Sequence, residues 1–249
     1  MSERLDGTVA LVTGASSGIG EATARALAAQ GATVALVARR VERLERLAAE
    51  LDGAIAIEAD ITQQPQAAGA IDRTVSELGR LDTLVNNAGV MLNGPIVGAP
   101  LEEWDRMVAI NVSALLYMAH AALPHLLEAA EEAPRRVTDM VNISSIAGRF
   151  ANRGAGVYNA TKFGVNAFSE SLRQEVTTRH VRISVIEPGV VKTELFGHQR
   201  PETQERYEKM FGELEKLDAS DIAEAIEYIV TRPRRVAVAE MLVRPTEQA

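Results

Sequence analysis

Tyr158 and Lys162 are the pair of residues whose types and spacing best suit proton transfer in this sequence. On a helix, residues four apart share a face and lie about one turn from each other. A phenol has a pKa of about 10 and is a poor acid at neutral pH. A nearby lysine ammonium stabilises the phenolate and lowers that pKa. We therefore expect Tyr158 to exchange a proton with a substrate oxygen, helped by Lys162.

Ser144 and Ser145 follow an expected strand at 137–143 and add hydroxyl groups to this pair. In an open parallel sheet, ligands bind beyond the carboxyl ends of the strands. A serine hydroxyl there can hydrogen-bond a carbonyl or alcohol oxygen and orient it. Hydrolysis is a poor alternative, because neither serine lies in a Gly-x-Ser-x-Gly turn and the histidines show no triad context.

A glycine-rich segment at 13–20, Thr-Gly-Ala-Ser-Ser-Gly-Ile-Gly, joins the first expected strand to the first expected helix. Gly14 permits a tight turn, Gly18 lets the backbone approach a diphosphate, and Gly20 lets helix and strand pack closely. The phosphate charge would meet the free N–H groups of the helix N-terminus. Strand, turn and helix in this order predict a dinucleotide site rather than a purely structural turn.

The second expected strand, 33–38, ends in Ala38 and is followed by Arg39 and Arg40, with no acid. An acid there would accept hydrogen bonds from the ribose 2′-hydroxyl of NAD, whereas an arginine fork binds a 2′-phosphate. The sequence therefore favours NADP(H), although both arginines are also compatible with ordinary solvated charges. Asp60, after the third strand, would hydrogen-bond the adenine amino group or cap the next helix.

Strand-like and helix-like segments alternate along the whole chain, which predicts a single α/β domain over 1–249. The fold is expected to be a Rossmann-type, doubly wound parallel sheet of about seven strands with helices on both faces. Strands are expected at 8–13, 33–38, 55–59, 82–86, 137–143, 181–186 and 236–243. Helices are expected at 20–30, 41–51, 63–78, 101–127 (bent or broken near Asn111), 157–178 and 219–230.

Two irregular segments interrupt the alternation. The charged run at 128–136 is expected to be a solvated loop. The long connection at 192–214 carries apolar and aromatic side chains, and a connection of this length is more often functional than idle. We expect it to be a lid over a largely apolar substrate pocket. Arg149 or Arg153 would meet a substrate carboxylate there, or lie on the surface.

Composition excludes several classes of function. Hydrophobic residues make up 47% and charged residues 24% of the 249 residues, which is typical of a globular protein. A net charge of −8 argues against a nucleic-acid partner. The absence of cysteine removes disulfides, thiolate catalysis and cysteine-bound zinc. His120 and His125 are five apart on an expected helix, so no metal site is predicted.

The segment 107–127 has no charged residue and is long enough to span a membrane. It also contains polar residues that a spanning helix would have to bury, so a core or interface helix is the better interpretation. The N-terminus shows no pattern of a secretory signal. We expect a cytoplasmic protein without membrane contact.

Taken together, these features resemble the short-chain dehydrogenase/reductase family, in its compact single-domain form, over nearly the whole length of the chain. The motifs stand in the family's order at 13–20, Asn86-Asn87-Ala88-Gly89, Asn111, Ser145, Tyr158, Lys162, Pro188-Gly189 and Thr193. The 13 residues from Ser145 to Tyr158 are the family's usual spacing and select Ser145 over Ser144. Within the family the chain is most similar to NADP-dependent serine and 3-hydroxy-acid dehydrogenases and to clavulanate dehydrogenase.

The resemblance implies an NADP(H)-dependent enzyme that transfers a hydride between nicotinamide and an aldehyde, ketone or alcohol. Tyr158 would be the general acid and base, Lys162 would lower its pKa and hold the nicotinamide ribose, and Ser145 would bind the substrate oxygen. Asn111 would keep a break in its helix and hold a water leading to Lys162. The alternative is a regulatory protein that binds NADP(H) without chemistry.

The resemblance also implies a cofactor site and an assembly. The residues expected at the cofactor are Gly14, Ser16, Ser17, Gly18, Ile19, Gly20, Arg39, Arg40, Asp60, Ile61, Asn87, Ala88, Gly89, Tyr158, Lys162, Pro188, Gly189, Val191 and Thr193. The partners expected are a small carbonyl or alcohol substrate and further copies of the chain. A homotetramer, or a homodimer, would pack the helices at 111–127 and 157–178.

Overall fold

In the computed structural model, which describes residues 3–132 and 134–248, seven parallel strands form one sheet. The strand order is β3-β2-β1-β4-β5-β6-β7, so the chain builds outward from β1 and then returns to add β4 on its other side. The doubly wound sheet expected from the sequence is confirmed. The strands are β1 (Val9–Thr13), β2 (Thr33–Ala38), β3 (Ile55–Glu58), β4 (Thr83–Asn86), β5 (Thr138–Ile143), β6 (Val181–Pro188) and β7 (Glu240–Val243).

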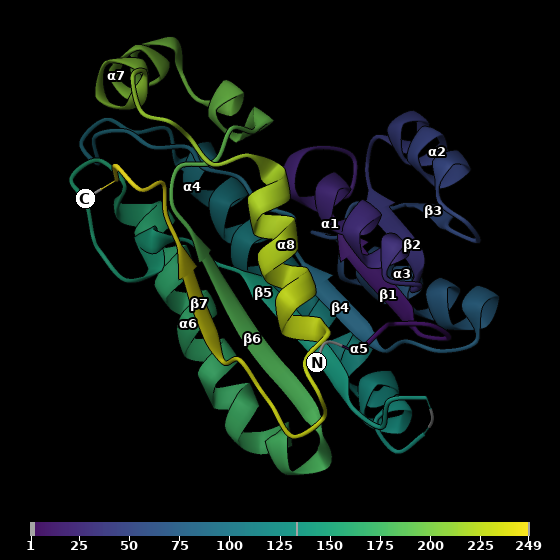
Figure 1. The fold of residues 1–249 in the computed structure, drawn as a ribbon. Helices are drawn as coiled ribbons and strands as arrows, with labels where there is room; N and C mark the ends of the chain where they lie inside the picture. The colour runs from purple at the N-terminus through teal and green to yellow at the C-terminus, as the bar shows by residue number, and fades with distance from the viewer. Residues whose placement is uncertain (1–2, 133, 249) are drawn as a thin grey trace.

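Helices cover both faces of this sheet (Figure 1). They are α1 (Gly18–Ala29), α2 (Val41–Glu50), α3 (Gln64–Leu78), α4 (Leu101–Val108), α5 (Ala114–Ala129), α6 (Gly156–Val176), α7 (Pro201–Phe211) and α8 (Ala219–Val230). Helices α3, α5 and α6 pack on one face, while α1, α2 and α8 pack on the other. The strand ends nearest β1 and β4 are the point where ligands bind in such sheets.

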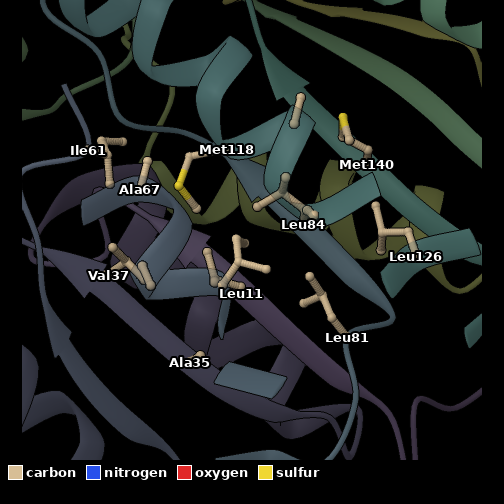
Figure 2. Close-up of a cluster of buried hydrophobic side chains, with 14 of the residues drawn as sticks. Leu11, Ala35, Val37, Ile61, Ala67, Leu81, Leu84, Met118, Leu126 and Met140 are labelled. Atoms are coloured by element: carbon tan, nitrogen blue, oxygen red, sulfur yellow. The ribbon is translucent and has the colours of Figure 1, made fainter. Parts of the chain in front are cut away.

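Strands β1 to β6 contribute side chains to two separate cores because successive residues point to opposite faces, whereas the edge strand β7 packs only Met241 and Val243 on one of them. In β1, Leu11 belongs to the core beneath α3 and α5, whereas Ala10 and Val12 belong to the core beneath α1 and α8. Figure 2 shows the first core, where Leu11 lies beside Leu84 and Met118. Burial on both faces explains why the strands are continuous apolar runs rather than alternating ones.

The break expected near Asn111 is a π-helical turn, Ala109–Ser113, between α4 and α5. The side-chain oxygen of Asn111 accepts a hydrogen bond from Val90 N at 2.8 Å, and its amide donates to Val90 O at 2.9 Å. A helix from Leu101 to Ala129 is long and apolar enough to cross a membrane by length and composition. Its buried side chains pack on the sheet as part of the first core, so we interpret it as a core helix.

Three sequence expectations need correction. The segment 192–214 is not irregular, since it holds a 3-10 turn, Glu194–His198, and the helix α7, which begins with Pro201 at a position that suits proline. Strand β7 begins at Glu240 rather than at 236. In the charged run at 128–136, whose Ala133 lies outside the described residues, Arg135 is buried and pairs with the fully buried Asp139. A buried carboxylate requires such a partner.

Candidate active site

One large cavity, of about 1230 Å³, opens at the carboxyl ends of the strands. Helix α7 lies beyond these ends, on the side to which the arrows of β6 and β7 point (Figure 1). All the residues predicted for catalysis or cofactor binding line this cavity except two, Gly20 and Asn111. These two lie behind its wall and shape it.

The glycine-rich turn lines the end of the cavity beside β1 and β2. Gly14 and Gly18 have φ of +67° and +57°, a backbone conformation that favours glycine. A Cβ on Gly20 would lie 2.4 Å from Gly14 O, so only glycine lets α1 pack this closely. Helix α1 begins at Gly18 and its N-terminus has no side-chain cap. Its N–H groups therefore fit a diphosphate such as that of a dinucleotide.

A second turn, after β4, is fastened to the end of β1 through the Thr13 hydroxyl. Thr13 Oγ1 accepts hydrogen bonds from Asn87 N at 2.9 Å and from Ala88 N at 3.1 Å. The side-chain amide of Asn87 donates to Thr13 O at 2.8 Å. Asn87 thus lines the cavity and also holds the turn after β4 against the end of β1. This role of Thr13 had no sequence signal, because it joins turns more than 70 residues apart.

Tyr158 and Ser145 form the candidate proton-transfer pair. Tyr158 is 6% exposed and its hydroxyl shares a hydrogen bond with Ser145, whose Oγ also accepts from Ala147 N at 3.1 Å. Ser144 is buried and its hydroxyl donates instead to Lys162 O at 3.3 Å. The geometry therefore agrees with the choice of Ser145.

Lys162 lies one helical turn from Tyr158, with its Nζ 5.8 Å from the centre of the phenol ring. That Nζ donates a hydrogen bond to Ile143 O at 2.8 Å. Burial raises the pKa of Tyr158 to about 12, partly offset by the Ser145 hydrogen bond, and lowers the pKa of Lys162 to about 8. Lys162 is not among the causes of the Tyr158 shift, so the expected lowering of the phenol pKa by Lys162 stays a prediction.

The two arginines after β2 differ in their surroundings. Arg39 lines the cavity and is exposed. Arg40 donates to the hydroxyls of Ser16 and Ser17 at 2.9 and 2.8 Å, and to the carboxylate of Glu194 at 2.8 Å. Its guanidinium is thus already engaged by the glycine-rich turn and by the segment after β6.

Asp60 and Ile61 line the cavity beside these arginines. Asp60 Oδ1 accepts hydrogen bonds from Thr62 N at 3.1 Å and Thr62 Oγ1 at 2.7 Å. Helix α3 begins later, with Gln63 as its N-cap. The interpretation of Asp60 as a helix cap is therefore wrong, which leaves it as a polar group on the cavity wall.

The opposite end of the cavity is largely apolar and lies beneath α7. Phe196 and Tyr207 pack with ring centres 4.8 Å apart, next to Met91 and Leu195. Arg153 and Arg206 line this end. Arg149 does not line it, because its guanidinium pairs with the buried Glu187 at 2.6 Å and with Glu240.

The last residues of the described chain complete the wall near Gly189, which sequence reasoning missed. Gln248 Oε1 accepts a hydrogen bond from Val190 N at 3.0 Å, and Gly189 N donates to Val243 O at 2.7 Å. A Cβ on Gly189 would lie 3.0 Å from Pro245 Cδ and 3.2 Å from the backbone Cα of Arg244, so glycine eases the close approach of this segment. No local pattern near Gln248 indicates this contact.

Comparison with known proteins agrees with this geometry. Residues 8–204 match the family model described as short chain dehydrogenase. An uncharacterized oxidoreductase of Staphylococcus epidermidis is 36% identical over 238 residues, which are 95% of this chain and 96% of the relative. The closed form of serine dehydrogenase complexed with NADP+ superposes with a TM-score of 0.89 at 33% identity, covering 97% of this chain and 96% of that one. A 3-ketoacyl-(acyl-carrier-protein) reductase from Brucella melitensis complexed with NADH gives 0.86 at 29% identity, covering 97% and 98%.

Proposed function

Because the chain belongs to the short-chain dehydrogenase family, we propose that it is an NADP(H)-dependent oxidoreductase acting on a carbonyl or alcohol substrate. One observation carries the proposal. The buried Tyr158, hydrogen-bonded to Ser145 and one turn from Lys162, lines the same cavity as the glycine-rich turn. A proton donor and a dinucleotide cradle in one cavity suit the reduction of an aldehyde or ketone.

NADP(H) is proposed as the cofactor on two grounds. The residue that follows β2 is the exposed Arg39, and no acid stands at the end of that strand, where NAD enzymes need one. The serine dehydrogenase that this chain resembles was solved with NADP+. The diphosphate would lie at the N-terminus of α1, with the adenosine toward Arg39, Arg40 and Asp60.

The bound nicotinamide supplies or accepts the hydride, and the chain's own residues handle the proton. Tyr158 donates its phenolic proton to the substrate oxygen during reduction and recovers one during oxidation. Ser145 orients that oxygen through its hydroxyl. As Tyr158 loses its proton, the Lys162 ammonium stabilises the phenolate and holds the nicotinamide ribose. Asn111 maintains the π-helical turn and holds a water through which Lys162 exchanges protons with solvent.

The substrate is proposed to be a carbonyl or alcohol compound of modest size. The apolar wall formed with Phe196 and Tyr207 supports an apolar body on that substrate. We propose that residues 192–214 act as the lid over this end, within a single domain spanning 1–249. Arg153 is the candidate for contact with any acidic group of the substrate, since Arg149 is held in its ion pairs.

We further propose a cytoplasmic homotetramer. An exposed apolar side chain on α6, Phe163 at 44%, supports burial of that helix against a second copy, and the uncharged α5 is proposed to pack beside it. The alternative function is an NADP(H)-binding regulator without turnover. Retention of Asn111, Ser145, Tyr158 and Lys162 together argues against it, since a sensor does not need this set.

A panel of aldehydes and ketones tests the proposal, with NADPH consumption measured by absorbance. Turnover of at least one compound by the purified chain, abolished in Tyr158→Phe, is the expected result. Tight NADPH binding with no turnover of any aldehyde, ketone or alcohol would favour the regulator instead.

A further inference from the structure

Glu194 forms ion pairs with two arginines, Arg40 and Arg43, at the start of α2. It is the first residue of the turn after β6, and its two carboxylate oxygens accept from Arg40 Nη1 and Arg43 Nη1, both at 2.8 Å. The two arginines hold the pKa of Glu194 at about 2, so it is ionised at neutral pH. A contact across more than 150 positions of the chain thus ties the base of the lid to the start of α2.

The guanidinium of Arg40 has little hydrogen-bonding capacity left. Its Nε and Nη2 donate to Ser16 Oγ at 3.1 and 2.9 Å, and Nη2 also donates to Ser17 Oγ at 2.8 Å. An arginine has five N–H groups, so these contacts and the one to Glu194 engage almost all of them. A further anion can bind Arg40 well only by displacing one of its present partners.

The same segment also approaches the glycine-rich turn directly. Thr193, next to Glu194, lies so close to Gly18 that a Cβ on Gly18 would be 3.2 Å from Thr193 Cγ2. The carboxylate of Glu194 is therefore held at the wall of the cavity, near the place where the adenosine ribose is proposed to lie. Arg43 does not line the cavity, whereas Arg39 and Arg40 do.

We propose that Glu194 is a cofactor-specificity residue, whose carboxylate competes with the 2′-phosphate of NADP(H) for Arg40. The inference rests on the proposed function, because it takes the 2′-phosphate to bind beyond the end of β2. Like charges repel at short range, so the carboxylate disfavours a phosphate dianion while leaving a ribose 2′-hydroxyl almost unaffected. Glu194 thereby narrows the preference for NADP(H) over NAD(H) that Arg39 and Arg40 create.

The test uses adenosine 2′,5′-bisphosphate and ADP as probes, because only the first carries a 2′-phosphate and neither can react. Isothermal titration calorimetry of Glu194→Gln should show affinity for the bisphosphate raised about three- to tenfold, as expected for a partly exposed ion pair. Its affinity for ADP should stay unchanged. Glu202→Gln is the matched control, since Glu202 lies on the same segment and lines the cavity without contacting Arg40 or Arg43.

A double-mutant cycle shows whether the effect passes through Arg40. In an Arg40→Gln background, the gain from Glu194→Gln should largely disappear. The proposal is overturned if Glu194→Gln binds the bisphosphate with unchanged or lower affinity, or if its affinity for ADP rises by the same factor. If the unmodified protein binds NADPH but Glu194→Gln has no effect, only this inference fails. If it binds neither NADPH nor the bisphosphate, the proposed function fails with it.

Discussion

The Nζ atom of Lys162 donates a hydrogen bond of 2.8 Å to the backbone carbonyl of Ile143, at the carboxyl end of β5. This contact fixes the ammonium between the sheet and the helix that carries Tyr158. The amine is buried, which lowers its pKa to about 8. The protein therefore keeps a cation in a place where folding alone does not favour one, and such positions are typical of functional sites.

We predict that Lys162→Met stabilises the protein near neutral pH at the expense of its chemistry. An unfolded lysine keeps its proton up to about pH 10.4, whereas the folded Lys162 loses it near pH 8. The unfolded state thus binds more protons between these values, and the unmodified protein gains stability as pH rises through them. Lys162→Met removes the cost of burying this charge but also removes the hydrogen bond to Ile143 O. The net effect should be a free energy of unfolding roughly 2 kcal/mol higher at pH 7.

Urea unfolding at pH 7 and pH 10.5 measures this difference, with the exposed Lys192→Met as the control. The advantage of Lys162→Met should shrink toward zero at the higher pH. An advantage that is the same at both pH values would show that the buried charge is not its cause.

Asn111 is predicted to stabilise the fold independently of any catalytic role. Asn111→Ala would leave the buried N–H and C=O of Val90 without partners, which costs about 2–4 kcal/mol. Ser113→Ala, in the same π-helical turn, should cost much less. Thermal unfolding of both variants compares them, and equal stabilities would mean that the turn does not depend on Asn111.

The cofactor preference is predicted to follow Ala38 and Arg39. The unmodified protein should prefer NADPH over NADH about 10²-fold, since charge-assisted hydrogen bonds to a phosphate contribute about 1.5–3 kcal/mol each. The double variant Ala38→Asp with Arg39→Leu should reverse the preference, because the new carboxylate repels the phosphate and accepts from the hydroxyl. Steady-state kinetics with both cofactors measures it. Equal use of NADH and NADPH by the unmodified protein would mean that Arg39 is only a surface charge.

Assembly is predicted to depend on the exposed apolar face of α6. Phe163→Asp places a charge at the proposed contact and should lower the mass measured by light scattering from that of a tetramer. Val97→Asp, in a loop and 93% exposed, should leave the mass unchanged. A monomer of about 27 kDa for the unmodified protein at micromolar concentration would reject the proposed assembly.

The elements that hold the site were predictable because they are local. The glycine-rich turn, the strand ends and the four-residue step from Tyr158 to Lys162 follow from short-range geometry. The pKa values were not predictable, since they depend on how deeply the tertiary structure buries both groups. The ion pairs of Glu194 with Arg40 and Arg43 were not predictable either, because nothing near Glu194 in the sequence indicates a partner so far away.

The segment at 192–214 illustrates a different limit. Its aromatic side chains suggested a lid, and Pro201 followed by Glu202 is a usual helix start that could have located α7. The buried Arg135 had no such signal, because a run of charges reads as solvated unless the buried Asp139 is known. Sequence reasoning thus missed burial and contacts that only the tertiary structure creates, such as those of Thr13, Gln248 and Glu194.

The most direct test of the central claim compares Tyr158→Phe with the unmodified protein in NADPH binding and in turnover of a carbonyl substrate. Phenylalanine keeps the ring but lacks the proton, so NADPH should bind with nearly unchanged affinity while turnover falls about 10²–10⁴-fold. Ser144→Ala, one residue before Ser145 and with its hydroxyl bonded to Lys162 O instead, should retain most activity. Turnover by Tyr158→Phe within a few-fold of the unmodified protein, at unchanged NADPH affinity, would contradict the assignment of Tyr158 as the proton donor.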